Sequence, residues 1–335
     1  MANLDQLLKN TARSLYLSAN LLPAPIRDTF CIAYLLCRYA DTIADTSLLP
    51  PDKRLYWISL FPTCVEKEDP HLLDTLTHHI CTSQKDAREA QLLQNLPLCL
   101  EAYSKLPAQQ KKIILHVVNS VCEGMEIDLQ TFPDEKSGKL AAFTTPEELE
   151  NYCHLMGGEP GLFWSQLLLD MHGSILHPNV LLPLGKNIGD ALQVVNILRD
   201  LPRDLRIGRC YIPSDDLVEE GIIPTDLLKP QFAVQFDPVK RKWIAWARKK
   251  LLSACTFFEG LPLKEPRNRA AVAWPVLWAA DTLNLLEKEK NLLDPAVRVK
   301  IKRWRVYGTM LATPPLLVCN LLFTEWLKHK LSAEK

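Results

Sequence analysis

Apolar residues recur along most of the chain at the three- and four-residue spacing of amphipathic helices. Strict alternation of apolar and polar residues, the pattern of a half-buried strand, is nearly absent, and only 12 glycines are available for tight hairpin turns. Most of the 24 prolines, Pro62 among them, fall between the apolar-periodic segments and mark expected segment ends. The pattern therefore predicts an all-α protein whose helices are punctuated by proline.

The predicted helices cover residues 3–18, 26–46, 52–60, 71–82, 86–104, 107–129, 146–171, 180–206, 236–259, 267–289 and 295–330, the last broken at Pro314. Thr145-Pro146-Glu147-Glu148 has the signature of a helix start, with threonine at the N-cap and glutamate three positions later. The polar stretch 134–143 before it is predicted to be a flexible loop. Neither a dividing linker nor a solenoid-length repeat is visible, so we expect one all-α domain over residues 1–335.

Composition and charge narrow the range of functions. An apolar content of 47% suffices for a large core, and 39 basic residues balance 39 acidic ones. A net charge of zero gives no support for a general nucleic-acid binder. Any phosphate-binding cations must therefore be clustered locally.

The ten cysteines do not indicate a disulfide framework. They form no CxxC pair, and the N-terminal residues are polar and lack the apolar core of a signal peptide. We therefore expect reduced, mostly buried thiols in a cytoplasmic protein.

No run of 18 uninterrupted apolar residues is present, so no transmembrane helix is predicted. The most apolar segment, Tyr307–Trp326, contains Pro314 and Pro315 and follows the basic stretch Arg298–Arg305. Packing in the core is the favoured interpretation of this segment, and peripheral contact with a membrane is the alternative.

Two short segments carry acidic side chains at helical spacing. On a helix, Gln193, Asn196, Asp200 and Asp204 fall along one stripe, which is rich in oxygen acceptors. Carboxylates four residues apart repel, so a cation is expected to face them, and hard oxygen ligands are those that Mg²⁺ prefers. Pro202 is expected to kink this helix or end it near Leu201, which would displace Asp204 from the stripe.

The second acidic segment lies earlier in the chain. Tyr34, Arg38, Asp41 and Asp45 share one face of a predicted helix that is otherwise largely apolar. Carboxylates in such surroundings are costly unless they are paired or bound to a metal. An Arg38–Asp41 ion pair within a bundle, or an exposed polar stripe, remains an alternative to a metal site.

Basic residues accompany the later acidic segment. Arg199, Arg203, Arg206 and Arg209 interleave with the carboxylates, and Tyr211 follows. This pattern suits a ligand with several negative charges, held by Mg²⁺ on one side and guanidinium groups on the other.

Three stretches together resemble the squalene/phytoene synthase family of head-to-head prenyl transferases. They are RSLYLSANLLPAPIRDTFCIAYLLCRYADTIADT, YCHLMGGEPG and GDALQVVNILRDLPRDLRIGRCYIP, and they span about 200 residues in the family's order. The resemblance implies an all-α isoprenoid synthase fold with the two acidic motifs on opposite walls of a deep apolar cavity.

The resemblance also implies a reaction. Two farnesyl or geranylgeranyl diphosphates would condense through a cyclopropylcarbinyl diphosphate, which a second ionisation then rearranges. Squalene formation from farnesyl diphosphate with reduction by NADPH is the outcome the motifs resemble most. Phytoene or dehydrosqualene synthesis, which needs no reductant, is the alternative, and a non-catalytic lipid-binding or assembly protein of the same fold is the alternative from another class.

By motif position, the resemblance implies three groups of site residues. The Mg²⁺ ligands would be Asp41, Asp45, Asn196, Asp200 and Asp204. The diphosphate-binding residues would be Arg13, Ser14, Arg38, Arg199, Arg209 and Tyr211, with Gln193 lining the same site. Tyr34, Tyr152 and Arg199 would act at the reacting groups.

One stretch departs from the family pattern. Met156-Gly157-Gly158-Glu159-Pro160-Gly161 replaces the usual small and apolar run, which puts the local helix geometry and the cavity wall in question. No GxGxxG motif follows a strand, so the sequence excludes a Rossmann-type NAD(P) site, although squalene synthases bind NADPH without one.

Overall fold

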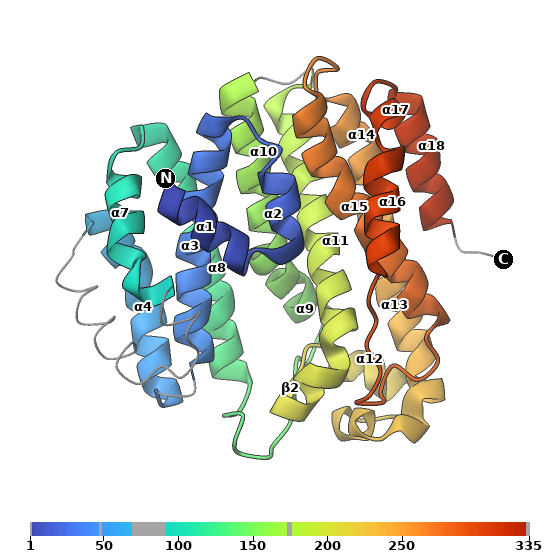
Figure 1. Ribbon diagram of the computed structural model, residues 1–335. Coiled ribbons are helices and arrows are strands. Elements are labelled where there is room, and N and C mark those ends of the chain that lie inside the picture. Colours follow the sequence, from blue (N-terminus) through green and yellow to red (C-terminus); the bar gives the residue numbers. More distant parts are fainter. Residues whose placement is uncertain (1, 47–48, 69–91, 173–175, 333–335) are drawn as a thin grey trace. The chain divides into compact units, whose positions relative to one another are not determined.

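The computed structural model describes residues 2–46, 49–68, 92–172 and 176–332, and these residues are almost entirely helical, as predicted (Figure 1). Their contacts group the chain into two compact units. The N-terminal unit comprises Met1–Gln130 and Gln166–Met171, and the C-terminal unit comprises Thr131–Ser165 and His172–Lys335. The expectation of a single domain stays a prediction.

The N-terminal unit is built around one long buried helix, α3. Its elements are α1 (Ala2–Thr11), α2 (Arg13–Ala19), α3 (Ala24–Asp45), α4 (Pro51–Lys67), α7 (Leu96–Ser104) and α8 (Ala108–Thr131). Helix α3 contacts α1, α2, α4 and α7, and its side chains Leu35, Leu36 and Ile43 are fully buried.

Two helix boundaries in this unit differ from the predictions. The helix expected over 3–18 is divided between α1 and α2, and the helix expected to end at 60 continues through Pro62 to Lys67. Buried Trp57, Phe61 and Val65 lie on both sides of this proline, and their packing outweighs the backbone hydrogen bond that it removes. The helix predicted over 71–82 and the start of the one at 86 lie outside the described residues.

The C-terminal unit contains a larger set of helices and two very short strands. Its elements are β1 (Ala141–Ala142), α9 (Pro146–Cys153), the π-helical turn η1 (His154–Gly158), α10 (Glu159–His172), α11 (Pro178–Asp204), η2 (Leu205–Ile207), β2 (Arg209–Cys210), α12 (Ser214–Glu219), η3 (Pro224–Leu228), η4 (Pro230–Phe232), α13 (Ala233–Leu251), α14 (Ser253–Glu259), α15 (Pro266–Lys288), α16 (Arg303–Ala312), α17 (Pro314–Leu317) and α18 (Asn320–Leu331). Helix α10 is divided between the units: Gln166–Met171 belong to the N-terminal unit, and the rest of the helix belongs to the C-terminal unit.

Helix α11 is the centre of the C-terminal unit and contacts η1, α9, α13, α14 and α15. Glycines let it approach η1 and the start of α10 at backbone distance. A Cβ atom on Gly189 would lie 2.0 Å from the carbonyl oxygen of Gly157, and one on Gly161 would lie 2.2 Å from that of Gly185. Any larger residue would force these helices apart.

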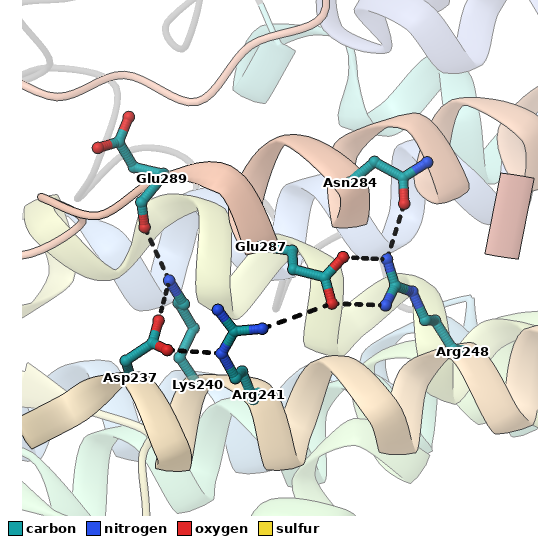
Figure 2. Close-up of polar contacts among 7 residues, drawn as sticks. All are labelled: Asp237, Lys240, Arg241, Arg248, Asn284, Glu287 and Glu289. Carbon is teal, nitrogen blue, oxygen red and sulfur yellow. Dashed lines mark hydrogen bonds and ion pairs between the residues drawn. The ribbon is translucent and has the colours of Figure 1, made fainter. Parts of the chain in front are cut away.

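Polar side chains join α13 to α15 (Figure 2). Arg248 donates to both carboxylate oxygens of Glu287 at 2.8 Å and to Asn284 at 2.7 Å. Lys240 donates to the backbone carbonyl of Glu289 at 2.7 Å, and so satisfies an acceptor at the carboxyl end of α15. The cluster fixes the alignment of the two helices.

A buried arginine attaches the last helices to the same unit. Arg269 of α15 is fully buried and donates to the carbonyl oxygens of Phe258, Leu261 and Leu317 and to the side chain of Asn320. It thereby connects α14 and α15 with α17 and α18. Burial lowers the pKa of its guanidinium to about 10, so it stays charged at neutral pH.

The apolar segment Tyr307–Trp326 takes two different environments. Helix α18 buries Phe323 and Leu327, and Phe323 stacks on Phe258 with ring centroids 3.9 Å apart. In contrast, Tyr307 and Leu311 of α16 are 58% and 82% exposed. The favoured interpretation of the segment as core is therefore right for the Phe323 and Leu327 face of α18 and wrong for the outer face of α16.

The helix predicted to begin at residue 295 begins at Arg303 instead. Asp294 accepts a hydrogen bond from the backbone N–H of Ala296 at 2.8 Å, and its own N–H donates to Asn291 at 2.9 Å. Such local side-chain and turn hydrogen bonds compete with helix formation.

The cysteines of the described chain are free thiols, and most are buried. Burial raises the pKa of Cys210 to about 12, and that of Cys31 likewise to about 12. These thiols are protonated and serve as small core residues.

Candidate active site

The first acidic segment forms a polar stripe on α3. Tyr34, Arg38 and Asp41 are half-buried and Asp45 is exposed, whereas the neighbouring apolar positions are almost all buried. Arg38 and Asp41 form an ion pair. This pair was the structural alternative foreseen from the sequence, and it leaves the carboxylates on the accessible side of the helix.

Both carboxylates of this stripe lie near the carboxyl end of α3, and Asp45 is its last residue. A helix carboxyl end carries about half a negative charge, so anionic side chains there are unfavourable by roughly 0.3–1 kcal/mol each. The local field thus favours a cation.

The second acidic segment repeats this arrangement on α11. Gln193, Asn196, Asp200 and Asp204 follow one another on the less buried side, and the amide of Asn196 donates to Gln193 at 3.5 Å. Of the two effects expected of Pro202, a kink or a helix end near Leu201, the end is wrong, because α11 continues through Pro202 to Asp204. Leu198, Leu201 and Pro202 are all buried, and this packing maintains the helix across the missing hydrogen bond. Asp204 therefore stays four residues from Asp200 on the same helix.

Arg199 is paired with Asp200 through two hydrogen bonds, from Nε at 2.9 Å and from Nη2 at 2.6 Å. The hydrogen bonds to Asp200 raise the pKa of the Arg199 guanidinium. Both side chains are about two-fifths exposed, at 39% and 41%. The first carboxylate of each acidic pair therefore has an arginine beside it.

Two predicted site tyrosines, distant in sequence, meet in the structure. Tyr152 at the end of α9 stacks on Tyr211 just after β2, with ring centroids 4.9 Å apart. Phe143 and Phe132 complete a buried aromatic cluster around them. The parallel pairing of β1 with β2, which sequence analysis missed, brings residues 141–143 to this cluster.

Arg209 is the one predicted diphosphate ligand that begins a strand. Its guanidinium pairs with Glu135 at 3.2 Å, from the segment predicted to be a flexible loop. Gly208 before it has a positive φ of 86°, and a Cβ there would lie 2.4 Å from the carbonyl oxygen of Lys139. The turn therefore requires glycine. Arg13 and Ser14 lie at the start of α2, and their side chains are outside the described residues.

The stretch that departs from the family pattern has a regular structural explanation. His154–Gly158 forms a π-helical turn that runs without a break from α9 into α10, and Pro160 is the second residue of α10, directly after this turn. Glu159 pairs with His154 Nε2 at 3.2 Å. The turn places Gly157 against Gln193, because a Cβ on Gly157 would lie 2.8 Å from that side chain's Cβ. π-helical turns of this kind occur frequently at functional sites.

A buried carboxylate behind this turn was not singled out from the sequence. Asp190 of α11 is 1% exposed and accepts hydrogen bonds from Lys186 at 2.8 Å and Lys250 at 2.6 Å. The i,i+4 spacing of Lys186 and Asp190 was the available signal. Because both lysines already bind the Asp190 carboxylate, this cluster stabilises the contact between α11 and α13 and is not an open site.

The carboxylates on α3 and α11 fit a magnesium ion that is also held by phosphate. Among the described side chains, no group of three or more His, Cys, Asp and Glu residues could hold a metal ion alone. Mg²⁺ is commonly bound by one or two carboxylates with water and substrate phosphates completing the shell. The two acidic pairs belong to different units, and each supplies the two carboxylates that such a site needs.

Comparisons with known proteins agree with the motifs. The sequence model of the family described as squalene/phytoene synthase matches residues 8–305. A bifunctional lycopene cyclase/phytoene synthase from Pyrenophora tritici-repentis is 29% identical over 270 residues, covering 79% of this chain and 43% of the relative. A presqualene diphosphate synthase from Zymomonas mobilis is 28% identical over 303 residues, covering 89% and 88%. The chain thus spans less than half the length of the first of these relatives.

Solved structures show the same fold. The complex of TcSQS with BPH1237 has a TM-score of 0.81 at 20% identity and is covered to 92%, with all of this chain aligned. Squalene synthase HpnC from Alicyclobacillus acidocaldarius has a TM-score of 0.61 at 17% identity, with 86% of this chain and 93% of that one covered. Together with the family match over residues 8–305, this fold places the chain in the squalene/phytoene synthase family of prenyl transferases.

Proposed function

We propose that the protein joins two prenyl diphosphates head to head, through a cyclopropylcarbinyl diphosphate, in a Mg²⁺-dependent reaction. The observation that carries this proposal is the repeated arrangement on α3 and α11. Each helix ends in two carboxylates spaced by four residues, with an arginine beside the first of them.

The proposed metal ligands are Asp41 and Asp45 on α3 and Asn196, Asp200 and Asp204 on α11. Bound Mg²⁺ would supply positive charge to the departing diphosphate, which is the large electrostatic requirement of ionising an allylic diphosphate. The helix carboxyl ends add to the affinity for the cation.

Arg38 and Arg199 are proposed to contact the diphosphates, with Arg209, Tyr211, Gln193, Arg13 and Ser14. In the structure both arginines are paired with neighbouring aspartates at partly exposed positions. Exposed ion pairs of this kind contribute about 0–1 kcal/mol. Exchange of the carboxylate for a diphosphate oxygen therefore costs little, and the arginines are already positioned beside the proposed metal ligands.

Tyr34 and Tyr152 are proposed to border the reacting carbons. Tyr152 is 4% exposed and lies in an aromatic cluster with Tyr211, Phe143 and Phe132. Aromatic faces attract cations, and an apolar wall excludes the water that would quench a carbocation. The phenol can also accept or relay a proton when the cyclopropane forms.

For the product, we propose squalene, formed from farnesyl diphosphate with reduction by NADPH. Phytoene or dehydrosqualene, formed with loss of a proton and without reductant, is the second candidate. The similarity to two bifunctional lycopene cyclase/phytoene synthases favours this second outcome, and similarity to a presqualene diphosphate synthase favours the shared first step.

The proposal is tested by supplying farnesyl or geranylgeranyl diphosphate with Mg²⁺, with and without NADPH, and identifying the hydrocarbon. Asp41→Asn and Asp200→Asn should each lower turnover by more than ~100-fold, since losing a metal ligand should exceed the loss from an outer-shell partner. Asp52→Asn and Asp215→Asn, at exposed aspartates on α4 and α12, serve as matched controls and should retain normal turnover.

Three results would contradict the proposal. They are normal turnover by both metal-site variants, normal turnover in excess chelator, and no hydrocarbon or cyclopropyl product from the wild-type protein with either substrate. The last result would favour the non-catalytic alternative. A product that is reduced only when NADPH is present identifies the squalene reaction, and one unaffected by NADPH identifies the second candidate.

A further inference from the structure

Exposed apolar side chains are concentrated near the end of the chain. Of the 14 large apolar side chains exposed in the described residues, six lie between Trp304 and Leu322. The others are scattered over several elements, as is normal for a protein surface. A local concentration of this kind marks an interaction surface.

Helix α16 presents the clearest part of this surface. Trp304, Tyr307 and Leu311 are 65%, 58% and 82% exposed and follow the i, i+3, i+7 spacing of one helical face. Thr309, on the opposite face, is buried, and α16 contacts α15 (Figure 1). We call Trp304, Tyr307 and Leu311 the α16 stripe. Its apolar face therefore points away from α15, the reverse of a core-packing helix.

Basic side chains flank the stripe on both sides. At 100° per residue, Arg303 and Arg305 lie on either side of Trp304, and both are exposed. The segment before them adds the exposed cations Arg298, Lys300 and Lys302. From Pro295 to Thr324 the sequence contains no aspartate or glutamate. An apolar face within a basic segment that contains no acidic residue is complementary to an anionic, apolar partner.

We propose that the α16 stripe and its flanking cations dock the protein on the surface of an anionic lipid bilayer. Tryptophan and tyrosine prefer the boundary between headgroups and acyl chains, leucine inserts below it, and arginines contact lipid phosphates. Helix α16 would lie on the membrane surface, since none of the described helices is long and apolar enough to cross a membrane. Helix α16, with 10 residues, is also anchored to the protein through α15 and α17.

The proposal is independent of the reaction proposed above, and its test uses no substrate. The full chain is sedimented with vesicles of phosphatidylcholine containing roughly one-third phosphatidylserine, and with vesicles of phosphatidylcholine alone. We expect the protein to bind the anionic vesicles much more strongly, and added salt to weaken the binding.

Two variants test the two components separately. Combined Trp304→Ser, Tyr307→Ser and Leu311→Ser should lower binding to anionic vesicles at least ~10-fold by removing the inserted groups. Combined Arg303→Gln and Arg305→Gln should lower this binding about 30-fold, because each cation near an anionic surface strengthens binding roughly fivefold. Val234→Ser, at an 81% exposed valine of α13, is the matched control and should bind like the wild type.

The variants should keep the melting temperature of the wild type, because the substituted side chains are exposed. The proposal is overturned if the wild type stays in the supernatant with anionic vesicles, or if the α16 stripe variant binds them as well as the wild type does. It is also overturned if light scattering detects a concentration-dependent dimer that the stripe variant abolishes, since the stripe would then belong to a second copy of the chain.

Discussion

The close approach of α11 to the π-helical turn η1 makes Gly189 sensitive to even the smallest substitution. The Cβ of Gly189→Ala would lie 2.0 Å from the carbonyl oxygen of Gly157, where ordinary contact is about 3.4 Å. The two backbones must therefore separate by about 1.4 Å, the difference between these distances. Neither atom belongs to a flexible side chain that could turn aside.

The expected loss of stability follows from that separation. A gap of 0.5–1 Å already forfeits roughly a quarter to a half of the dispersion energy between facing atoms, and overpacking typically costs about 1–3 kcal/mol. Alanine in place of an interior helical glycine returns about 1 kcal/mol through its higher helix propensity. Because the gap exceeds an ångström across a whole helix contact, we expect a net loss of about 2–3 kcal/mol.

Gly308→Ala provides the matched control. Gly308 lies inside α16, and a Cβ there meets nothing within 4 Å, so only the propensity gain of about 1 kcal/mol remains. Urea unfolding followed by circular dichroism should place the two variants on opposite sides of the wild type. A Gly189→Ala midpoint equal to or above that of Gly308→Ala would refute the close backbone contact.

Two further predictions concern the polar connections of the C-terminal unit. Arg269→Met keeps the methylene packing but leaves the acceptors on Leu317 and Phe258 without their charged donor, so it should cost about 3–5 kcal/mol and expose α17–α18 to limited proteolysis. The ion pair with Arg248 lowers the pKa of Glu287, so its stabilisation is complete above the ordinary value of 4.5 and is lost as pH falls through the lowered folded value. Glu287→Gln should therefore cost about 1.5–3 kcal/mol in urea unfolding at pH 7, and the difference from wild type should shrink in acid; a constant difference would contradict this assignment.

The long helices that carry the proposed metal ligands could be predicted from the sequence because their signals are local and repeated. The apolar periodicity around Asp41 placed α3 within two residues of its observed ends. The helix start at Thr145 was also confirmed, with both hydrogen bonds of the capping box present. Such features depend on residues three or four positions apart, which a single sequence displays.

Other features depend on contacts that the sequence does not display. The stacking of Tyr152 on Tyr211 joins residues that are 59 positions apart, and it relies on a strand pair of two residues on each side. Likewise, the low helix propensity of proline predicts that α11 ends near Pro202, but the packing of its buried neighbours keeps the helix intact to Asp204. Apolar composition also could not separate the buried face of α18 from the exposed face of α16, because each face combines leucine with aromatic residues.

The electrostatic arrangement at the ends of α3 and α11 provides the last argument for the proposed function. Each end combines the negative end of a helix dipole with two carboxylates, and every component of this set is unfavourable by a few tenths of a kcal/mol or more. The arginine paired with the first carboxylate at each end offsets part of this, since exposed ion pairs contribute about 1 kcal/mol or less. A fold optimised for stability alone would place such carboxylates at helix amino ends, as it does with Glu147 and Glu148 of α9. The chain instead places the same unfavourable set at two separate helix ends, and a bound divalent cation would turn both of them into favourable sites.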